Sequence, residues 1–209
     1  MIQSNVITEY LLQSKAIKLE PTKPFTWASG WKSPIYCDNR IILSFPVIRK
    51  IITQAFLEKI TTFFPSAGLI AGVATGAIAQ GALVADALNL PFAYVRSAAT
   101  QQGLGNVIEG IVTPGQKIVV IEDLVSTGGS SLQAVEALRE TGADVLGMVA
   151  IFTYGFQLAL DHFKAANCPL YTLTNYEIMI DLALKTNYIE SDQVELLKAW
   201  RLHPDTWGQ

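Results

Sequence analysis

Two adjacent carboxylates followed by a cluster of hydroxyl and glycine residues form the segment of this chain best suited to chemistry. Glu122 and Asp123 come directly after four apolar residues, 118–121, which are typical of a buried strand. The chain then reads Leu-Val-Ser-Thr-Gly-Gly-Ser-Ser over residues 124–131, where a helical pattern begins. Two carboxylates at the end of a strand can accept hydrogen bonds from the two hydroxyls of a ribose ring.

The residues after the acidic pair have the properties of a phosphate-binding loop. Gly128 and Gly129 let the backbone turn tightly and approach a ligand closely. The hydroxyls of Ser126, Thr127 and Ser130 and the N–H groups at the start of a helix can donate to phosphate oxygens. The alternative is an ordinary turn in which a serine only caps the helix. The combination favours a site that binds a ribose 5-phosphate at both ends, although neither a Walker nor a Rossmann glycine motif is present.

The rest of the chain predicts an α/β fold that brings this segment to the edge of a mostly parallel sheet. Apolar strands alternate with amphipathic helices, which indicates a sheet covered by helices on both faces. In such sheets ligands bind beyond the carboxyl ends of the strands. The expected strands cover residues 68–73, 91–95, 107–112, 117–121 and 145–152, and the expected helices cover residues 6–19, 46–60, 76–88, 130–140 and 155–165.

Composition excludes several other classes of protein. The 209 residues suit one domain, and a net charge of −3 indicates no basic surface for nucleic acid and no polybasic membrane anchor. Cys37 and Cys168 form no CxxC pair, and the N-terminus has no signal-peptide pattern, so we expect a cytoplasmic protein. The most apolar stretch, residues 67–84, indicates a buried strand and helix rather than a membrane span. His162 and His203 lack partners at metal-ligand spacing, which favours surface or packing roles over catalysis.

Two segments carry a resemblance to a known family. Residues 122–130 resemble the loop that binds phosphoribosyl pyrophosphate (PRPP) in type I phosphoribosyltransferases. Residues 25–40, Phe-Thr-Trp-Ala-Ser-Gly-Trp-Lys-Ser-Pro-Ile-Tyr-Cys-Asp-Asn-Arg, look like the N-terminal signature of the orotate branch. The segments at 72–76, 94–97 and 106–110 follow in the order typical of that branch.

This resemblance implies a fold and an activity. The fold would be a single type I phosphoribosyltransferase domain over residues 1–209, with an N-terminal hood at about 1–45 and a PRPP-binding core at about 65–155. The enzyme would be a glycosyltransferase of pyrimidine (UMP) biosynthesis that transfers ribose 5-phosphate from PRPP to orotate, giving orotidine 5′-monophosphate and pyrophosphate. It would form a homodimer with active sites shared across the interface. Mg²⁺ would arrive with PRPP, so no dedicated protein metal site is expected.

The resemblance also implies roles for individual residues. Glu122 and Asp123 would hold the ribose hydroxyls, and Arg96 would reach the pyrophosphate across the dimer interface; these three are the expected catalytic residues. Orotate would be bound by Ser126, Lys32 and Ser33, with Trp27 and Trp31 either lining the hood or packing at the dimer interface. The implied PRPP-binding residues are Arg96, Thr100, Gln102, Glu122, Asp123, Leu124, Val125, Ser126, Thr127, Gly128, Gly129 and Ser130.

The segment after Arg96 departs from the family pattern. Thr100 stands where the family has a catalytic lysine, and Gln102 stands where it has a histidine. No charged residue lies between Ser97 and Val107. Two hypotheses follow: a slow enzyme in which Arg96 and Mg²⁺ stabilise the leaving group, or a non-catalytic regulator that binds PRPP or a nucleotide. A purine phosphoribosyltransferase is a further alternative, disfavoured by the N-terminal signature.

Overall fold

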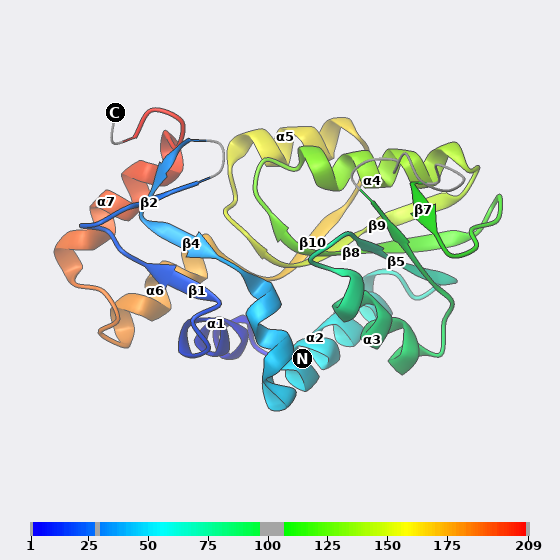
Figure 1. The fold of residues 1–209 in the computed structure, drawn as a ribbon, viewed down its shortest axis with the longest axis horizontal. Coiled ribbons are helices and arrows are strands. Elements are labelled where there is room, and N and C mark those ends of the chain that lie inside the picture. Colours follow the sequence, from blue (N-terminus) through cyan, green and yellow to red (C-terminus); the bar gives the residue numbers. More distant parts are fainter. Residues whose placement is uncertain (1, 28–29, 97–106, 208–209) are drawn as a thin grey trace.

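The computed structural model describes residues 2–27, 30–96 and 107–207, which include one six-stranded sheet of order β10-β9-β8-β5-β6-β7 (Figure 1). Neighbouring strands run parallel throughout, except that β7 is antiparallel to β6. The predicted α/β class with a mostly parallel sheet is confirmed. The strands are β5 (Leu69–Val73), β6 (Phe92–Val95), β7 (Ile108–Glu109), β8 (Lys117–Val125), β9 (Asp144–Thr153) and β10 (Leu170–Asn175).

Helices cover both faces of this sheet (Figure 1). One face carries α1 (Ser4–Gln13), α2 (Pro46–Phe63) and α3 (Ile78–Leu88), and the other carries α4 (Gly129–Glu140) and α5 (Gln157–Ala165). The chain continues into α6 (Tyr176–Lys185) and α7 (Ser191–Leu202), which lie beside the N-terminal strands. Among the described residues, no helix is long and apolar enough to cross a membrane.

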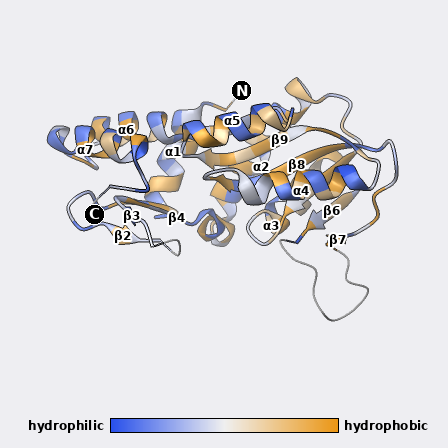
Figure 2. Cartoon of the chain, turned by 90° about the horizontal axis from the view of Figure 1, so that it is seen from above, coloured by the Kyte–Doolittle hydropathy of each residue, from blue (hydrophilic) through white to orange (hydrophobic). Residues whose placement is uncertain are grey.

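The central strand β8 is buried on both sides, and its side chains alternate between two cores. Ile118 and Val120 belong to the core under α4 and α5, whereas Val119 and Ile121 belong to the core under α1, α2 and α3. Figure 2 shows this pattern, with apolar strands beneath helices that carry both polar and apolar residues. A strand buried on both faces reads as a continuous apolar run, and this is why the sequence predicted it.

Helix α2 begins as the sequence predicted. Pro46 occupies its first turn, where a missing N–H costs nothing because the first N–H groups of a helix have no partner within the helix. Its inward face consists of the five apolar positions expected from the helical period, and all are buried: Ile48, Ile52, Ala55, Phe56 and Ile60.

The N-terminal segment differs from the prediction of one helix over residues 6–19. Helix α1 stops at Gln13, Lys15 takes a left-handed conformation with φ of 59°, and β1 (Ile17–Leu19) follows. The reason is a distant pairing, because β1 is antiparallel to β4 (Ile35–Cys37). A second small hairpin joins β2 (Phe25–Thr26) to β3 (Lys32–Ser33), and a 3₁₀ helix, η1 (Asn39–Ser44), leads into α2.

The strand predicted over residues 107–112 is also shorter than expected. Only Ile108 and Glu109 pair with β6, because β7 is an edge strand and Gly110 leaves the extended conformation with φ of 102°. A Cβ at Gly110 would lie 3.1 Å from the Cα of Ala93, so the chain passes close to β6 as it turns away.

Candidate active site

A cavity of about 660 Å³ opens at the carboxyl edge of the sheet. The sequence predicts a ligand site at this edge. It is bounded by the ends of β5, β6 and β8, by the first turns of α4 and by the segment before η1. Its lining consists of Cys37, Asp38, Arg40, Val73, Ala74, Thr75, Gly76, Val95, Arg96, Val107, Glu122, Asp123, Leu124, Ser130, Gln133 and Ala134. The structure therefore brings Arg96, the acidic pair and the start of α4 together.

The two neighbouring carboxylates have different surroundings. They lie within β8, which continues to Val125, and successive side chains of a strand point to opposite faces. Glu122 turns toward α4, where its Oε2 accepts a 2.8 Å hydrogen bond from the hydroxyl of Ser131. Its Oε1 accepts from the N–H of Asp123 at 3.0 Å. With an exposed fraction of 4%, Glu122 is the buried member of the pair.

Asp123 faces Gly76, which follows β5. A Cβ at Gly76 would overlap the Asp123 carboxylate, so the missing side chain is what leaves room for that group. The backbone carbonyl of Asp123 accepts a 2.6 Å hydrogen bond from Nδ2 of the buried Asn39. Sequence reasoning assigned Asn39 only a place in the signature, because its partner Asp123 is 84 residues away. It assigned Ser131 only a possible cap, and the hydrogen bond to Glu122 appears once the loop folds back on β8.

Residues 126–130, which the sequence predicts to bind phosphate and which are called the phosphate loop below, run from the end of β8 into the first residues of α4. Gly128 adopts φ of 84° at the N-cap of α4, a conformation that glycine accepts without strain. Within the described parts of the chain, no hydrogen bond uses the N–H groups of Thr127, Gly128 or Gly129. Unpaired N–H groups and the positive end of a helix together attract an anion, so the loop has the properties of a phosphate site.

The two arginines that line the cavity, Arg96 and Arg40, each form an ion pair with a carboxylate. Arg96, at the end of β6, lies 3.1 Å from Oε1 of Glu109. Arg40 forms an ion pair of 2.7 Å with Asp38, and this hydrogen-bonded guanidinium lowers the pKa of the Asp38 carboxyl. A pyrophosphate entering the cavity would therefore meet two guanidinium groups that carboxylates hold in place. Thr100 and Gln102 lie outside the described residues.

The predicted orotate residues Lys32 and Ser33 belong to β3 rather than to the described lining of the cavity. The ammonium of Lys32 donates to the hydroxyl of Thr26 at 2.8 Å, and the buried hydroxyl of Ser33 donates to the carbonyl of Ile35 at 2.8 Å. The backbone carbonyl of Lys32 accepts a 3.1 Å hydrogen bond from Nε1 of Trp200 in α7. The β2–β3 hairpin is thus anchored to α7.

Trp27 also packs inside the chain. Its ring lies 5.2 Å from that of Tyr154 and 5.6 Å from that of Trp200, and its Nε1 donates to the carbonyl of Ile35. The ring of Trp31 stacks on Trp27 at 6.5 Å. These contacts place Trp27 in an aromatic cluster that joins the β2–β3 hairpin to α7, a third role besides the two that the sequence left open.

Glu122→Gln is expected to stabilise the fold at neutral pH. Burial, and then the charge of Asp123, raise the pKa of Glu122 well above its ordinary value of 4.5. The folded chain therefore holds this proton more tightly than the unfolded chain, and the resulting stability is lost as pH rises from 4.5 through the raised pKa. Glutamine stays neutral, and the Ser131 hydroxyl can rotate to accept from its amide.

The measurement is the free energy of unfolding of parent and variant between pH 4 and pH 8. The difference should be small at the acid end and grow with pH. In a chain of this size about 1 kcal/mol moves the melting temperature by about 2–4 °C, which is easily resolved. A difference that does not change with pH would show that Glu122 carries no raised pKa.

Known proteins are similar to this chain in sequence and in fold. Residues 39–187 match the family model of the phosphoribosyl transferase domain. The orotate phosphoribosyltransferase of Bacteroides thetaiotaomicron is 58% identical over 202 residues, which cover 97% of this chain and 95% of the relative. That of Listeria innocua is 52% identical over 203 residues, covering 97% of each chain.

Solved structures agree in fold. The orotate phosphoribosyltransferase of Aeropyrum pernix superposes with a TM-score of 0.74 at 24% identity, covering 88% of this chain and 99% of that chain. The UMP synthase of Leishmania donovani superposes with a TM-score of 0.79 at 25% identity. This match covers 95% of the present chain but only 42% of the longer UMP synthase chain.

Proposed function

This chain belongs to the orotate phosphoribosyltransferase family, and we propose that it transfers the ribose 5-phosphate group of PRPP to orotate, giving orotidine 5′-monophosphate and pyrophosphate. One observation carries the proposal for this cavity: Glu122, Asp123 and Ser130 line it, and the segment between them, residues 126–129, has unused N–H groups although it does not itself line the cavity. A ribose 5-phosphate needs both, since its hydroxyls donate and its phosphate accepts.

The reaction is displacement of pyrophosphate from C1 of the ribose by a pyrimidine nitrogen, through a transition state with oxocarbenium character. Glu122 and Asp123 would hold the ribose hydroxyls, and the hydrogen bond from Ser131 would fix the Glu122 carboxyl at the end of the strand. Residues 124–130 would wrap the 5′-phosphate, with Ser126 also near orotate, and Arg96 would stabilise the departing pyrophosphate. The division into a hood at 1–45 and a PRPP-binding core at 65–155 is part of this proposal.

Mg²⁺ is proposed as a partner of PRPP, where it would neutralise charge on the pyrophosphate oxygens. Among the described residues there is no group of three His, Cys, Asp or Glu side chains that could hold the ion by themselves. The Asp123 carboxylate is a hard oxygen donor of the kind that Mg²⁺ prefers, so the cavity fits an ion that also uses oxygens of PRPP.

The remaining assignments also stay proposals. The roles of Lys32 and Ser33 in binding orotate draw no support from their contacts within the hairpin, and Thr100 and Gln102 are assigned from the resemblance alone. Two unpaired cysteines, Cys37 and Cys168, fit a cytoplasmic enzyme.

A homodimer is proposed as well, and exposed apolar side chains near α2 and α3 support it. Val47 is 66% exposed, and Phe45 and Leu83 are exposed as well, close to a groove between the two helices. Sedimentation equilibrium should give twice the mass of the chain, and a monomer at micromolar concentration would contradict this part of the proposal.

The activity is tested by the loss of orotate ultraviolet absorbance after PRPP and Mg²⁺ are added, with a reaction lacking Mg²⁺ as control. Loss that depends on Mg²⁺ is expected. No loss, together with thermal stabilisation by PRPP or orotidine 5′-monophosphate, would instead favour a regulator that binds without turnover. Adenine, guanine and hypoxanthine in place of orotate test the purine alternative, and we expect no reaction with them.

A further inference from the structure

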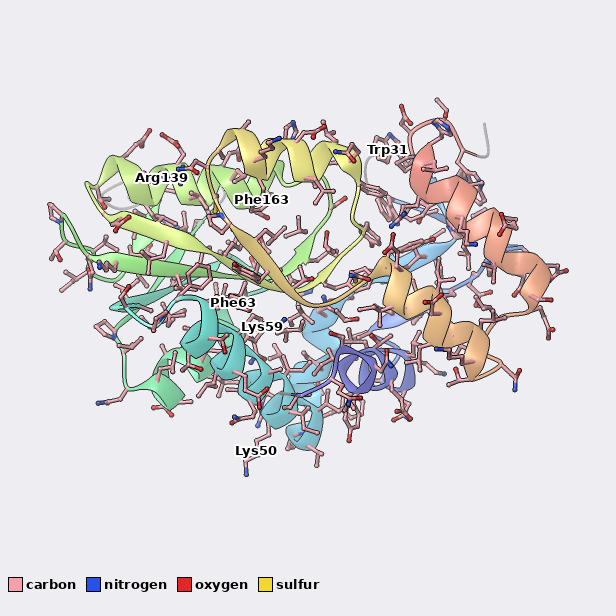
Figure 3. The ribbon with its side chains drawn as sticks, turned by 180° about the vertical axis from the view of Figure 1, so that it is seen from behind. Trp31, Lys50, Lys59, Phe63, Arg139 and Phe163 are labelled. Carbon is pink, nitrogen blue, oxygen red and sulfur yellow. The ribbon has the colours of Figure 1, made fainter. Side chains whose placement is uncertain are left out.

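One face of helix α5 contacts the phosphate loop. Ala159, His162 and Phe163 are spaced three and four residues apart, so they project from the same side of the helix. Nδ1 of His162 lies 3.0 Å from the backbone carbonyl oxygen of Thr127. A Cβ added to Gly128 would lie 2.9 Å from a ring carbon of Phe163, so the helix and the loop are in close contact. Figure 3 shows Phe163 on the side of α5 that faces the sheet.

Helix α5 is itself held in place at its far end. Arg139, in the last turn of α4, donates from Nη1 to the carbonyl of Ala166 at 2.8 Å and from Nη2 to the carbonyl of Asn167 at 3.1 Å. These two carbonyls lie at the C-terminal end of α5, where they have no partner within the helix. Arg139 therefore links α4, which follows the phosphate loop, to α5, which contacts that loop. Figure 3 shows Arg139 close to α5.

The contact between His162 and Thr127 has a defined direction. A carbonyl oxygen only accepts hydrogen bonds, so Nδ1 of His162 must carry the proton. In a trans peptide the C=O and the following N–H point in opposite directions. A Thr127 carbonyl that points at α5 therefore turns the N–H of Gly128 away from α5. Among the described residues nothing accepts from that N–H, so it is available to a ligand.

We infer that His162 is a positioning residue for the 5′-phosphate: its Nδ1–H holds the Thr127–Gly128 peptide so that the Gly128 N–H donates to the phosphate oxygens. The inference rests on the function proposed for the phosphate loop. His162 is exposed and does not line the cavity, so it acts through the loop rather than by touching substrate. Sequence reasoning could not find this role, because His162 and Thr127 are 35 residues apart.

The test compares His162→Ala with His162→Asn. Alanine removes the donor, whereas the asparagine amide nitrogen occupies nearly the same position as Nδ1 and keeps it. Calorimetry with ribose 5-phosphate, which needs no turnover, should show affinity reduced about 3- to 10-fold in the alanine variant, the range for one net hydrogen bond. The asparagine variant should bind within about twofold of the parent. KM for PRPP should rise by the same factor in the alanine variant, while KM for orotate changes by less than about twofold.

His203→Ala is the matched control, since it removes the other histidine of the chain from an exposed position near the C-terminus. All variants should melt within about 2 °C of the parent, because the removed rings are exposed. Any one of three results would overturn this inference without affecting the proposed function. These are an unchanged affinity of His162→Ala for ribose 5-phosphate, a His162→Asn variant that binds no better than His162→Ala, and a rise in KM for orotate equal to that for PRPP. A parent protein that binds no ribose 5-phosphate would overturn the proposed function together with it.

Discussion

Gly76→Ala is expected to fold like the parent chain and to lose about a hundredfold in kcat/KM for PRPP. A methyl group at this position would overlap the Asp123 carboxylate. The backbone of Gly76 is outside the left-handed region, so alanine meets no strain, and the displaced carboxylate lies at the end of a side chain that can rotate. Stability should therefore change little. The carboxylate, however, leaves its position in the cavity, and a misplacement of about 1 Å can cost about 10² in rate.

Gly68→Ala provides a control with the same chemical change. Gly68 precedes the other end of β5, away from the cavity, and its Cβ would meet only the carbonyl of Lys117 at 3.5 Å, an ordinary contact. This variant should keep the kcat/KM of the parent. Steady-state kinetics with PRPP as the varied substrate and a thermal melt of both variants make the comparison. A Gly76→Ala variant within about threefold of the parent would mean that the position of the Asp123 carboxylate does not limit the reaction.

The continuous apolar run of β8 predicted the edge of the sheet at which the cavity opens, but not how its two acids differ. The strand predicted from the sequence ends at residue 121, before Glu122. In the structure β8 continues through both acids, because the parallel pairing to β9 uses only backbone groups. Once both acids are within a strand, alternation sends Glu122 toward α4 and Asp123 toward Gly76. A short polar pair at the end of an apolar run does not reveal this, because the period of two becomes visible only over several residues.

Contacts between distant segments account for most of what the sequence could not predict. The β2–β3 hairpin is held by Trp200, which is fully buried against Trp27 and Tyr154 although α7 is the last helix of the described residues. Local propensity carries no information about such a contact. In the same way, the helix predicted over residues 6–19 ends at Gln13, and residues 17–19 form β1, whose partner β4 lies about 20 residues further along.

Asp123→Asn is expected to lower kcat/KM by about a hundredfold or more while leaving the fold at least as stable at neutral pH. The amide keeps the shape of the side chain and removes the charge. A hydrogen bond to a charged acceptor contributes about 1.5–3 kcal/mol, which corresponds to about 10- to 150-fold in rate. The positive charge that develops on the ribose adds to this loss, because the carboxylate would stabilise it in the cavity.

The same substitution should make it less costly for Glu122 to be charged inside the folded chain. The charge of Asp123 is the second largest cause, after burial, of the raised pKa of Glu122. Its removal lowers that pKa and weakens the pH dependence of stability described for Glu122→Gln. Denaturation at pH 7 and steady-state kinetics are the measurements. A variant with parental activity would show that Asp123 does not contact the ribose, and a clear loss of stability would show that its charge supports the fold.

A double variant tests whether Gly76→Ala lowers activity only through the Asp123 carboxylate or also independently of it. If Gly76→Ala lowers activity only by displacing the Asp123 carboxylate, then Gly76→Ala combined with Asp123→Asn should be no slower than Asp123→Asn alone, because the contribution that the methyl disturbs is already gone. Independent effects would multiply instead, to a loss of about 10⁴-fold or more. A multiplied loss would place a second function at Gly76, such as close approach of the backbone to pyrophosphate. The cycle thus tests whether this glycine acts only by leaving room for a carboxylate.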